Sequence, residues 1–165
     1  MVLTGFMGTG KSSVGRLLAK RLGFRFVDTD TWIEARAGRT IPQIFHQDGE
    51  AAFRQMETAA AQALAAETDQ VIATGGRLML DDENAAALGR HGRVFCLTAA
   101  PDDIIARLSQ DGGGRPLLDV PHPEARISRL LQERASGYGR FPQINTSGKT
   151  IEQVVEEIMQ CISQI

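Results

Sequence analysis

Short apolar segments rich in β-branched residues alternate along the chain with longer segments in which apolar residues recur every three or four positions. The short segments have the composition of buried strands, and the longer ones have the period of amphipathic helices. The predicted strands are Met1–Thr4, Phe24–Val27, Val71–Thr74, Val94–Thr98 and Gln143–Asn145. Because strands and helices alternate, we predict an α/β fold, a five-stranded parallel sheet with helices on both faces.

The predicted helices carry ordinary start and stop signals. They are Lys11–Leu22, Thr31–Ala37, Ile41–Gln47, Glu50–Glu67, Asp82–Leu88, Asp102–Ser109, Glu124–Ser136 and Ile151–Ser163. Gly23 follows the first helix, and Asp81 precedes the fifth as an N-cap. Thr150 and Gln153 have the spacing of a capping box at the start of the last helix.

The segment after the first predicted strand has the strongest functional signal, because ligands of parallel sheets bind beyond the carboxyl ends of strands. It reads Gly-Phe-Met-Gly-Thr-Gly-Lys-Ser over residues 5–12 and matches G-x-x-x-x-G-K-[ST]. Its glycines let backbone N–H groups wrap a phosphate, and the helix that begins at Lys11 directs its positive end at the same anion. We expect Lys11 to reach the β- and γ-phosphates and Ser12 to hold Mg²⁺. The alternative is a chance match, but a strand before the motif and an amphipathic helix after it favour phosphate binding.

Two carboxylates, Asp28 and Asp30, follow the second predicted strand. On an extended backbone both would project to the same side, into the crevice beside the phosphate loop. One can serve Mg²⁺ through water, and the other can accept a proton from an attacking hydroxyl. Asp28 is the candidate for the metal, since no other apolar strand ends in Asp. The alternative is a polar strand end, with Asp30 as the N-cap of the next helix.

Three arginines and a glycine pair are further candidates. Arg54, Arg115 and Arg134 are ordinary by composition, since most arginines are solvated surface charges. Arg115 differs because three glycines and a proline surround it, a pattern typical of a mobile lid that carries a cation over a site. Gly75 and Gly76 follow the third predicted strand, where they permit either a plain turn or the close approach of a ligand.

Composition narrows the possible functions. The chain has 165 residues, of which 42% are hydrophobic and 23% charged, with a net charge of −2. A protein that coats nucleic acid or anionic lipid needs a cationic surplus, and no apolar run approaches the roughly 18–20 residues of a membrane span. The two cysteines, Cys96 and Cys161, are too far apart to suggest a zinc site. We expect one cytoplasmic domain, a monomer, with neither nucleic acid nor membrane as a partner.

In their order along the chain, these motifs resemble the shikimate kinases, small P-loop kinases of the nucleoside-monophosphate-kinase type. Besides the phosphate loop, the matching segments are Asp28-Thr29-Asp30, Phe53-Arg54 with Glu57, Gly75-Gly76, Arg115–Leu118 and Arg134–Tyr138. The phosphate loop alone is shared by many NTPases, whereas the ordered set is far more specific. The resemblance implies a P-loop NTPase fold over residues 1–165, with a mobile lid at about 110–121 and a substrate-binding helical segment at about 31–60.

The resemblance also implies an activity, the transfer of the ATP γ-phosphoryl group to the 3-hydroxyl of shikimate with Mg²⁺ as cofactor. The residues that bind ATP would be Gly8, Thr9, Gly10, Lys11, Ser12, Ser13, Arg115 and, at the adenine end, Lys149. Those that bind shikimate would be Asp30, Arg54, Gly75, Gly76 and Arg134, with both guanidiniums on its carboxylate. Lys11, Asp30 and Arg115 would be catalytic, with Asp30 as the base, and Ser12 and Asp28 remain the metal residues.

Arg77 departs from the family pattern, which has a third glycine at this position. A guanidinium that pointed inward would repel Arg54 and Arg134, unless a carboxylate such as Glu57 paired with it. We therefore expect Arg77 to point away from the pocket, toward solvent or an acidic neighbour. Its replacement by glycine should keep the activity on shikimate within a few-fold.

Two other functions remain open from the residues alone. One is a kinase of the same fold that acts on a different small hydroxy acid, with Arg77 reshaping the pocket. The other is a non-catalytic ATP-binding regulator. The intact Lys11, Ser12, Asp30 and Arg115 disfavour the regulator, since a degenerate relative would have lost one of them.

Overall fold

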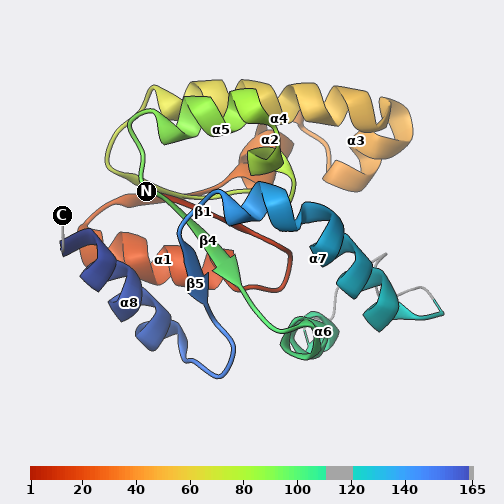
Figure 1. The fold of residues 1–165 in the computed structure, drawn as a ribbon. Helices are drawn as coiled ribbons and strands as arrows, with labels where there is room; N and C mark the ends of the chain where they lie inside the picture. Colours follow the sequence, from red (N-terminus) through yellow and green to blue (C-terminus); the bar gives the residue numbers. More distant parts are fainter. Residues whose placement is uncertain (111–120, 164–165) are drawn as a thin grey trace.

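A computed structural model of the chain describes residues 1–110 and 121–163 (Figure 1). Its strands form one sheet in the order β2-β3-β1-β4-β5, and every neighbouring pair is parallel. They are β1 (Val2–Gly5), β2 (Arg25–Asp28), β3 (Gln70–Ala73), β4 (Val94–Thr98) and β5 (Gln143–Asn145). The predicted five-stranded parallel sheet is confirmed, and every strand end lies within one residue of its predicted position.

The helices also follow the prediction, with differences at their ends. They are α1 (Lys11–Leu22), α2 (Thr29–Ala37), α3 (Ile41–Gln47), α4 (Gly49–Ala65), α5 (Asp82–Gly89), α6 (Pro101–Gln110), α7 (Pro123–Gly139) and α8 (Ile151–Ser163). The largest difference is at the C-terminal end of α7, which continues past the predicted end at Ser136 to Gly139. A 3₁₀ turn, η1 (Leu78–Leu80), was not predicted, because three apolar residues are too few to show a period.

Both faces of the sheet are covered by helices (Figure 1). Leu3 packs with residues of α1 and α8, whereas its neighbour Val2 packs with residues of α4 and α5. Val71 and Ile72 of β3 divide between the same two clusters. Successive residues of a strand point to opposite faces, so a sheet covered on both faces needs strands that are apolar at every position. The predicted arrangement of helices on both faces is confirmed.

Helix caps fix the local boundaries. The Asp81 carboxylate accepts a hydrogen bond from the backbone N–H of Asn84, 3.0 Å away, at the start of α5. At α8, Thr150 and Gln153 exchange side-chain-to-backbone bonds of 2.9 and 3.3 Å. Both predicted caps are confirmed, and each satisfies N–H groups that the first turn of a helix leaves without a partner.

The helices α2, α3 and α4 form a unit beside the ends of β2 and β3. They pack on one another through Ile33, Ile44, Phe53 and Ala60. Figure 1 shows α3 near one end of α4. This separate apolar cluster holds α4 in a fixed orientation, and so positions the polar side chains that α4 carries. In the part of the chain that the structure describes, no helix combines the length and apolar character needed to cross a membrane.

Candidate active site

The loop between β1 and α1 has the backbone of a phosphate cradle. Gly8 and Gly10 have φ values of 74° and 92°, a left-handed region that side chains disfavour. A Cβ atom on Gly5 would lie 2.2 Å from the carbonyl oxygen of Leu97, so β4 leaves no room for a side chain there. The glycines of the motif are therefore required by the loop's conformation and its packing.

Side chains of the loop's own sequence stabilise this shape. The Lys11 Nζ atom donates to the carbonyl oxygens of Gly5 and Phe6, at 2.9 and 2.8 Å. Thr9 Oγ1 donates to the Phe6 carbonyl oxygen at 2.7 Å. Lys11 thus lies across the loop at the N-terminal end of α1, where the helix dipole also favours an anion.

Ser12 and Asp28 face each other across the start of α1 and the end of β2. Ser12 Oγ donates to Asp28 Oδ2 over 2.8 Å. In octahedral Mg²⁺ coordination, with metal–oxygen bonds of about 2.1 Å, adjacent oxygen ligands lie about 3 Å apart. This oxygen pair therefore fits Mg²⁺, which usually takes one or two carboxylates together with waters and phosphate oxygens. Within residues 1–110 and 121–163, no cluster of three acidic, histidine or cysteine side chains competes for the ion.

The expected extended geometry of Asp28 and Asp30 is wrong. The backbone becomes helical at Thr29, and Asp28 is the N-cap of α2. Its Oδ1 accepts hydrogen bonds from the backbone N–H groups of Asp30 and Thr31, at 3.1 and 3.4 Å. The alternative that made Asp30 the cap is also wrong. Capping satisfies two N–H groups that extension would leave free, so the helix begins earlier than the strand pattern suggests.

Asp30 nevertheless lies close to the phosphate loop and to Gly75, since the charges of Lys11, Asp28 and Glu57 all act on it. Its Oδ1 atom is buried and, among the described residues, has no hydrogen-bond partner. Burial raises the pKa of Asp30 from 3.8 to about 6, and the negative charges of Asp28 and Glu57 add to the effect. A Cβ on Gly75 would lie 2.7 Å from this oxygen and 3.1 Å from Glu57 Oε1. The glycine therefore lets β3 end directly against the two carboxyl groups.

Arg54 of α4 lies between two carboxylates. Its Nη1 donates to Glu57 Oε2 at 2.5 Å, and its Nε and Nη2 donate to Glu50 Oε1 at 3.2 and 2.9 Å. The Glu57 side chain is only 3% exposed, and burial raises its pKa although Arg54 acts in the opposite direction. These ion pairs hold the Arg54 guanidinium in one orientation.

Arg134 approaches the other glycine. A Cβ on Gly76 would lie 3.8 Å from Arg134 Nη1, and the Arg134 guanidinium lies over the Phe6 ring, 5.3 Å from its centroid. One helical turn further along α7, the Tyr138 hydroxyl donates a hydrogen bond to the Gly76 carbonyl oxygen. Thr29 Oγ1 accepts from the Gly75 N–H at 2.8 Å, which joins β3 to α2. The residues expected to bind the molecule that receives the phosphoryl group thus converge from four segments: α2, α4, the segment after β3 and α7.

Arg77 points outward, as predicted. Its Nη1 donates to Glu50 Oε1 at 3.0 Å, and both side chains are about half exposed. Lys149 Nζ donates to Glu157 of α8 at 2.5 Å, and its contact with ATP stays a prediction. Arg115 and most of the expected lid lie outside the described residues.

Three residues with contacts at the site had no role assigned to them from the sequence. They are Glu57, Tyr138 and Arg107, of which Arg107 donates to the Gly8 carbonyl oxygen at 3.2 Å and to Thr146. Glu57 could have been found, because it lies three residues after Arg54 on a predicted helix. Tyr138 and Arg107 act through distant backbone carbonyls, which no sequence spacing reveals.

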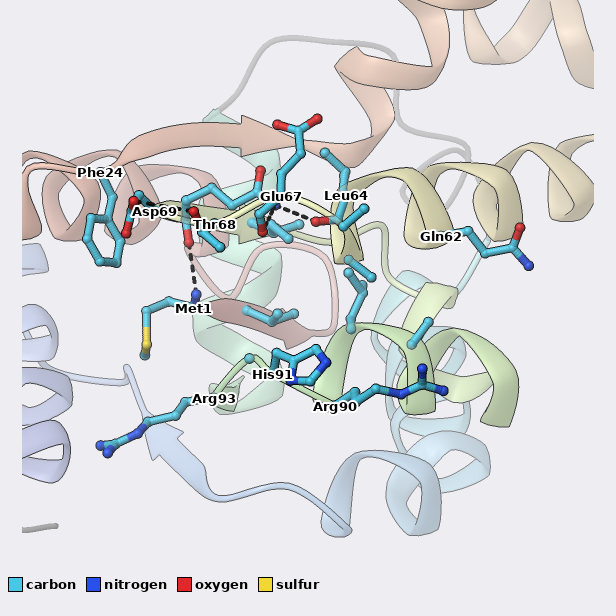
Figure 2. Close-up of a pocket in the computed structure, with 18 of the residues that line it drawn as sticks. Met1, Phe24, Gln62, Leu64, Glu67, Thr68, Asp69, Arg90, His91 and Arg93 are labelled. Carbon is cyan, nitrogen blue, oxygen red and sulfur yellow. Dashed lines mark hydrogen bonds between the residues drawn. The ribbon is translucent and has the colours of Figure 1, made fainter.

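A separate pocket lies at the opposite end of the sheet (Figure 2). Its volume is about 1180 Å³, and Met1, Gln70 and Arg93 line it at the amino ends of β1, β3 and β4. The phosphate loop follows the carboxyl end of β1, so the length of the sheet separates the two regions. None of the candidate site residues that the structure describes lines this pocket.

The cradle, the Lys11 ammonium at the loop and the Ser12–Asp28 oxygen pair have the arrangement of a P-loop phosphotransferase site, beside a cluster of carboxylate and guanidinium side chains. Comparison with known proteins leads to the same class of enzyme. The model of the shikimate kinase family matches residues 7–163. The chain belongs to the shikimate kinase family.

Individual relatives match along almost the whole chain. The shikimate kinase of Thermodesulfovibrio yellowstonii is 47% identical over 97% of this chain and 92% of its own. That of Thermus thermophilus is 44% identical over 97% of this chain and 88% of its own. The solved shikimate kinase of Acinetobacter baumannii, in complex with shikimate, superposes with a TM-score of 0.91 at 36% identity, over 99% of this chain and 92% of that one.

Proposed function

We propose that the protein transfers the γ-phosphoryl group of ATP to the 3-hydroxyl of shikimate and releases shikimate 3-phosphate and ADP. One observation carries the proposal. Asp30 presents a buried carboxyl oxygen, without a partner among the described residues, beside Gly75 and near Glu57, which is paired with Arg54. Its pKa of about 6 suits a base that works near neutral pH.

The phosphate side stabilises charge. Backbone N–H groups of residues 8–13 and the N-terminus of α1 would hold the phosphates of ATP. Lys11 would exchange its carbonyl contacts for the β- and γ-phosphate oxygens, where charge develops during transfer. Because the ammonium is already at the loop, little reorganisation is needed.

Ser12 and Asp28 would hold Mg²⁺. When bound, the ion neutralises phosphate charge and helps to align the γ-phosphorus with its acceptor. Binding would replace the hydrogen bond from Ser12 to Asp28 Oδ2, while Asp28 Oδ1 continues to cap α2. The cap therefore fixes the metal carboxylate in place.

The acceptor side orients shikimate. Arg54 and Arg134 would bind its carboxylate through charge-assisted hydrogen bonds, each contributing about 1.5–3 kcal/mol. The backbone of Gly75 and Gly76 would line the ring face, since neither carries a side chain that would fill the space. With the carboxylate held, the hydroxyls on the other side of the ring would face Asp30.

The chemical step is a direct transfer of the phosphoryl group from ATP to the hydroxyl. The 3-hydroxyl oxygen forms a bond to the γ-phosphorus, and the bond from that phosphorus to the β–γ bridging oxygen breaks, so that ADP leaves with the electron pair. Asp30 accepts the hydroxyl proton. Proximity contributes as well, because both reactants are held in one crevice.

The remaining assignments belong to the same proposal. Residues 1–165 would act as one kinase domain, with acceptor binding by the segment 31–60 and a lid at about 110–121 that brings Arg115 onto ATP. Lys149 would contact the adenine end after leaving Glu157. We propose a cytoplasmic monomer whose ligands are ATP and shikimate, and which binds neither nucleic acid nor membrane.

A coupled assay of ADP release tests the proposal directly. Shikimate is compared with gluconate, quinate and nucleoside monophosphates at equal concentration, with Asp30→Asn as the inactive control. The proposal expects shikimate to have the highest kcat/KM by at least about tenfold. A higher value for another hydroxy acid would instead indicate a kinase of the same family with a different acceptor. No ADP release with any acceptor would favour the regulator.

A further inference from the structure

Arg54, Arg77, Glu50 and Glu57 form a network of four charged side chains. One oxygen, Glu50 Oε1, accepts three hydrogen bonds, two from Arg54 and one of 3.0 Å from Arg77 Nη1. On its other edge Arg54 donates to Glu57. The network therefore contains two guanidiniums and two carboxylates, and its formal charge is zero.

Arg54 has few donors to spare. A guanidinium carries five N–H groups, and in the described part of the chain three of them are bonded to Glu50 and Glu57. Two remain for an incoming anion. If Arg77 were absent, a single guanidinium would face two carboxylates, and the net charge of −1 would repel a carboxylate substrate.

The position of Arg77 suits a side chain with this role. It lies at the start of η1 with φ of −115°, so the backbone there does not require glycine. From the segment that follows β3, the Arg77 side chain reaches Glu50 in the first turn of α4, and so joins the two segments that carry Gly76 and Arg54. Arg54 is the main cause that lowers the pKa of Glu50, and the charge of Arg77 adds to it; burial raises the pKa of Glu57, and Arg54 and Arg77 act in the opposite direction.

We infer that Arg77 is a positioning residue for the acceptor: by pairing with Glu50, it keeps the Arg54 guanidinium oriented and electropositive toward the carboxylate of the substrate. The inference rests on the proposed function and deepens it, because it assigns to the same site a residue that touches no substrate. It also predicts a preference for carboxylate acceptors over neutral ones, a preference that depends on Arg77.

The test is the steady-state kinetics of Arg77→Gln, which removes the charge without adding backbone freedom. Half-exposed ion pairs are weak, so we expect KM for shikimate to rise about three- to fivefold, with kcat and KM for ATP unchanged. The rise should shrink at high salt, because exposed charges are screened. Arg77→Lys should recover most of the affinity, since it restores the charge.

A matched control and a second background separate this role from a structural one. Arg129→Gln removes an equal charge from an exposed pair with Glu133 on α7 and should leave all constants unchanged. In a Glu50→Gln background, Arg77→Gln should have no further effect, because Arg77 acts through Glu50. Additive effects in this cycle, or an unchanged KM for shikimate in the single variant, would overturn the inference while leaving the proposed function intact. A wild-type enzyme that does not phosphorylate shikimate overturns both.

Discussion

The phosphate side and the acceptor side of the candidate site lie next to each other but are built in different ways. The phosphate side is mainly one continuous segment from Gly5 to Ser12, shaped by backbone conformation and by contacts within itself, to which Arg107 and Asp28 add single hydrogen bonds. The acceptor side brings together α2, α4, the end of β3 and α7, and ion pairs and single hydrogen bonds hold its side chains in place. A local structure can thus bind a ligand common to many enzymes, whereas specificity for one acceptor needs several distant segments.

The two sides also differ in electrostatic cost. On the acceptor side the buried Asp30 lies near two other carboxylates, Asp28 and Glu57, and its pKa is raised to about 6. The phosphate side places an ammonium and a helix N-terminus together, both of which attract an anion. The loop would therefore favour the binding of ATP by itself, whereas the acceptor side combines carboxylates that repel one another with guanidiniums that offset them.

The largest effect is expected when the Lys11 ammonium of the phosphate side is removed. Lys11→Met should lower kcat by about a thousandfold or more, because in the proposed function the lysine stabilises charge that develops only during transfer. The fold should survive, since the loop's glycine conformations and Thr9 contact remain. Turnover with saturating substrates and circular dichroism check the two parts. Turnover like that of the wild type would contradict the assignment of residues 5–12 as the phosphate-binding loop.

The second-largest effect is expected for Asp30→Asn, which should affect the acceptor side and leave the phosphate side unchanged. Loss of the base should lower kcat by about 10²- to 10⁴-fold. The Kd for ATP, measured by calorimetry, should change little, because Asp30 belongs to the acceptor side. A large loss of ATP affinity with unchanged turnover would give Asp30 a metal or structural role instead.

Arg54→Gln should affect the acceptor alone. Removal of a charge-assisted contact worth about 1.5–3 kcal/mol lowers kcat/KM for shikimate by about 10- to 150-fold. The KM for ATP should stay constant. Parallel kinetics with both substrates varied provide the measurement, and an equal rise in both KM values would show that the two sides are coupled.

The same contrast explains what the sequence could reveal. The phosphate loop and its helix were predicted from adjacent residues, because their geometry is local. Asp28 and Asp30 were found, but with the wrong backbone, since capping of α2 competes with extension of β2. The roles of Arg54 and Arg134 came from family resemblance, as only the packing of α4 and α7 brings the two helices to the glycine pair. Tyr138 was missed because its partner, a backbone carbonyl, has no signature.

A smaller effect is expected on the free energy of unfolding of the Asp30→Asn variant. Because folding raises the pKa of Asp30 from 3.8 to about 6, the native state binds the proton more tightly than the unfolded state does. Its contribution to stability is complete below pH 3.8 and is lost as the pH rises through 6. In metal-free buffer at pH 8, Asp30→Asn should therefore unfold with a free energy about 2–3 kcal/mol higher than the wild type. Urea titrations should show the gap narrowing toward pH 4, and a gap independent of pH would contradict the burial of charge.

The smallest effect is expected for Thr29, whose hydrogen bond with Gly75 joins α2 to the segment after β3. Thr29 is fully buried, and its Oγ1 accepts the N–H of Gly75 at 2.8 Å. Thr29→Val keeps the shape but leaves that N–H without its acceptor, which should cost about 1–2 kcal/mol of unfolding free energy. Thr29→Ser is the matched control, because it keeps the acceptor and loses only a methyl group. If the acceptor side depends on such tertiary bonds, the valine variant should also raise KM for shikimate a few-fold while KM for ATP stays constant. An equal change in the two constants would mean that the phosphate loop depends on the same bond, and that the two sides are less independent than their construction indicates.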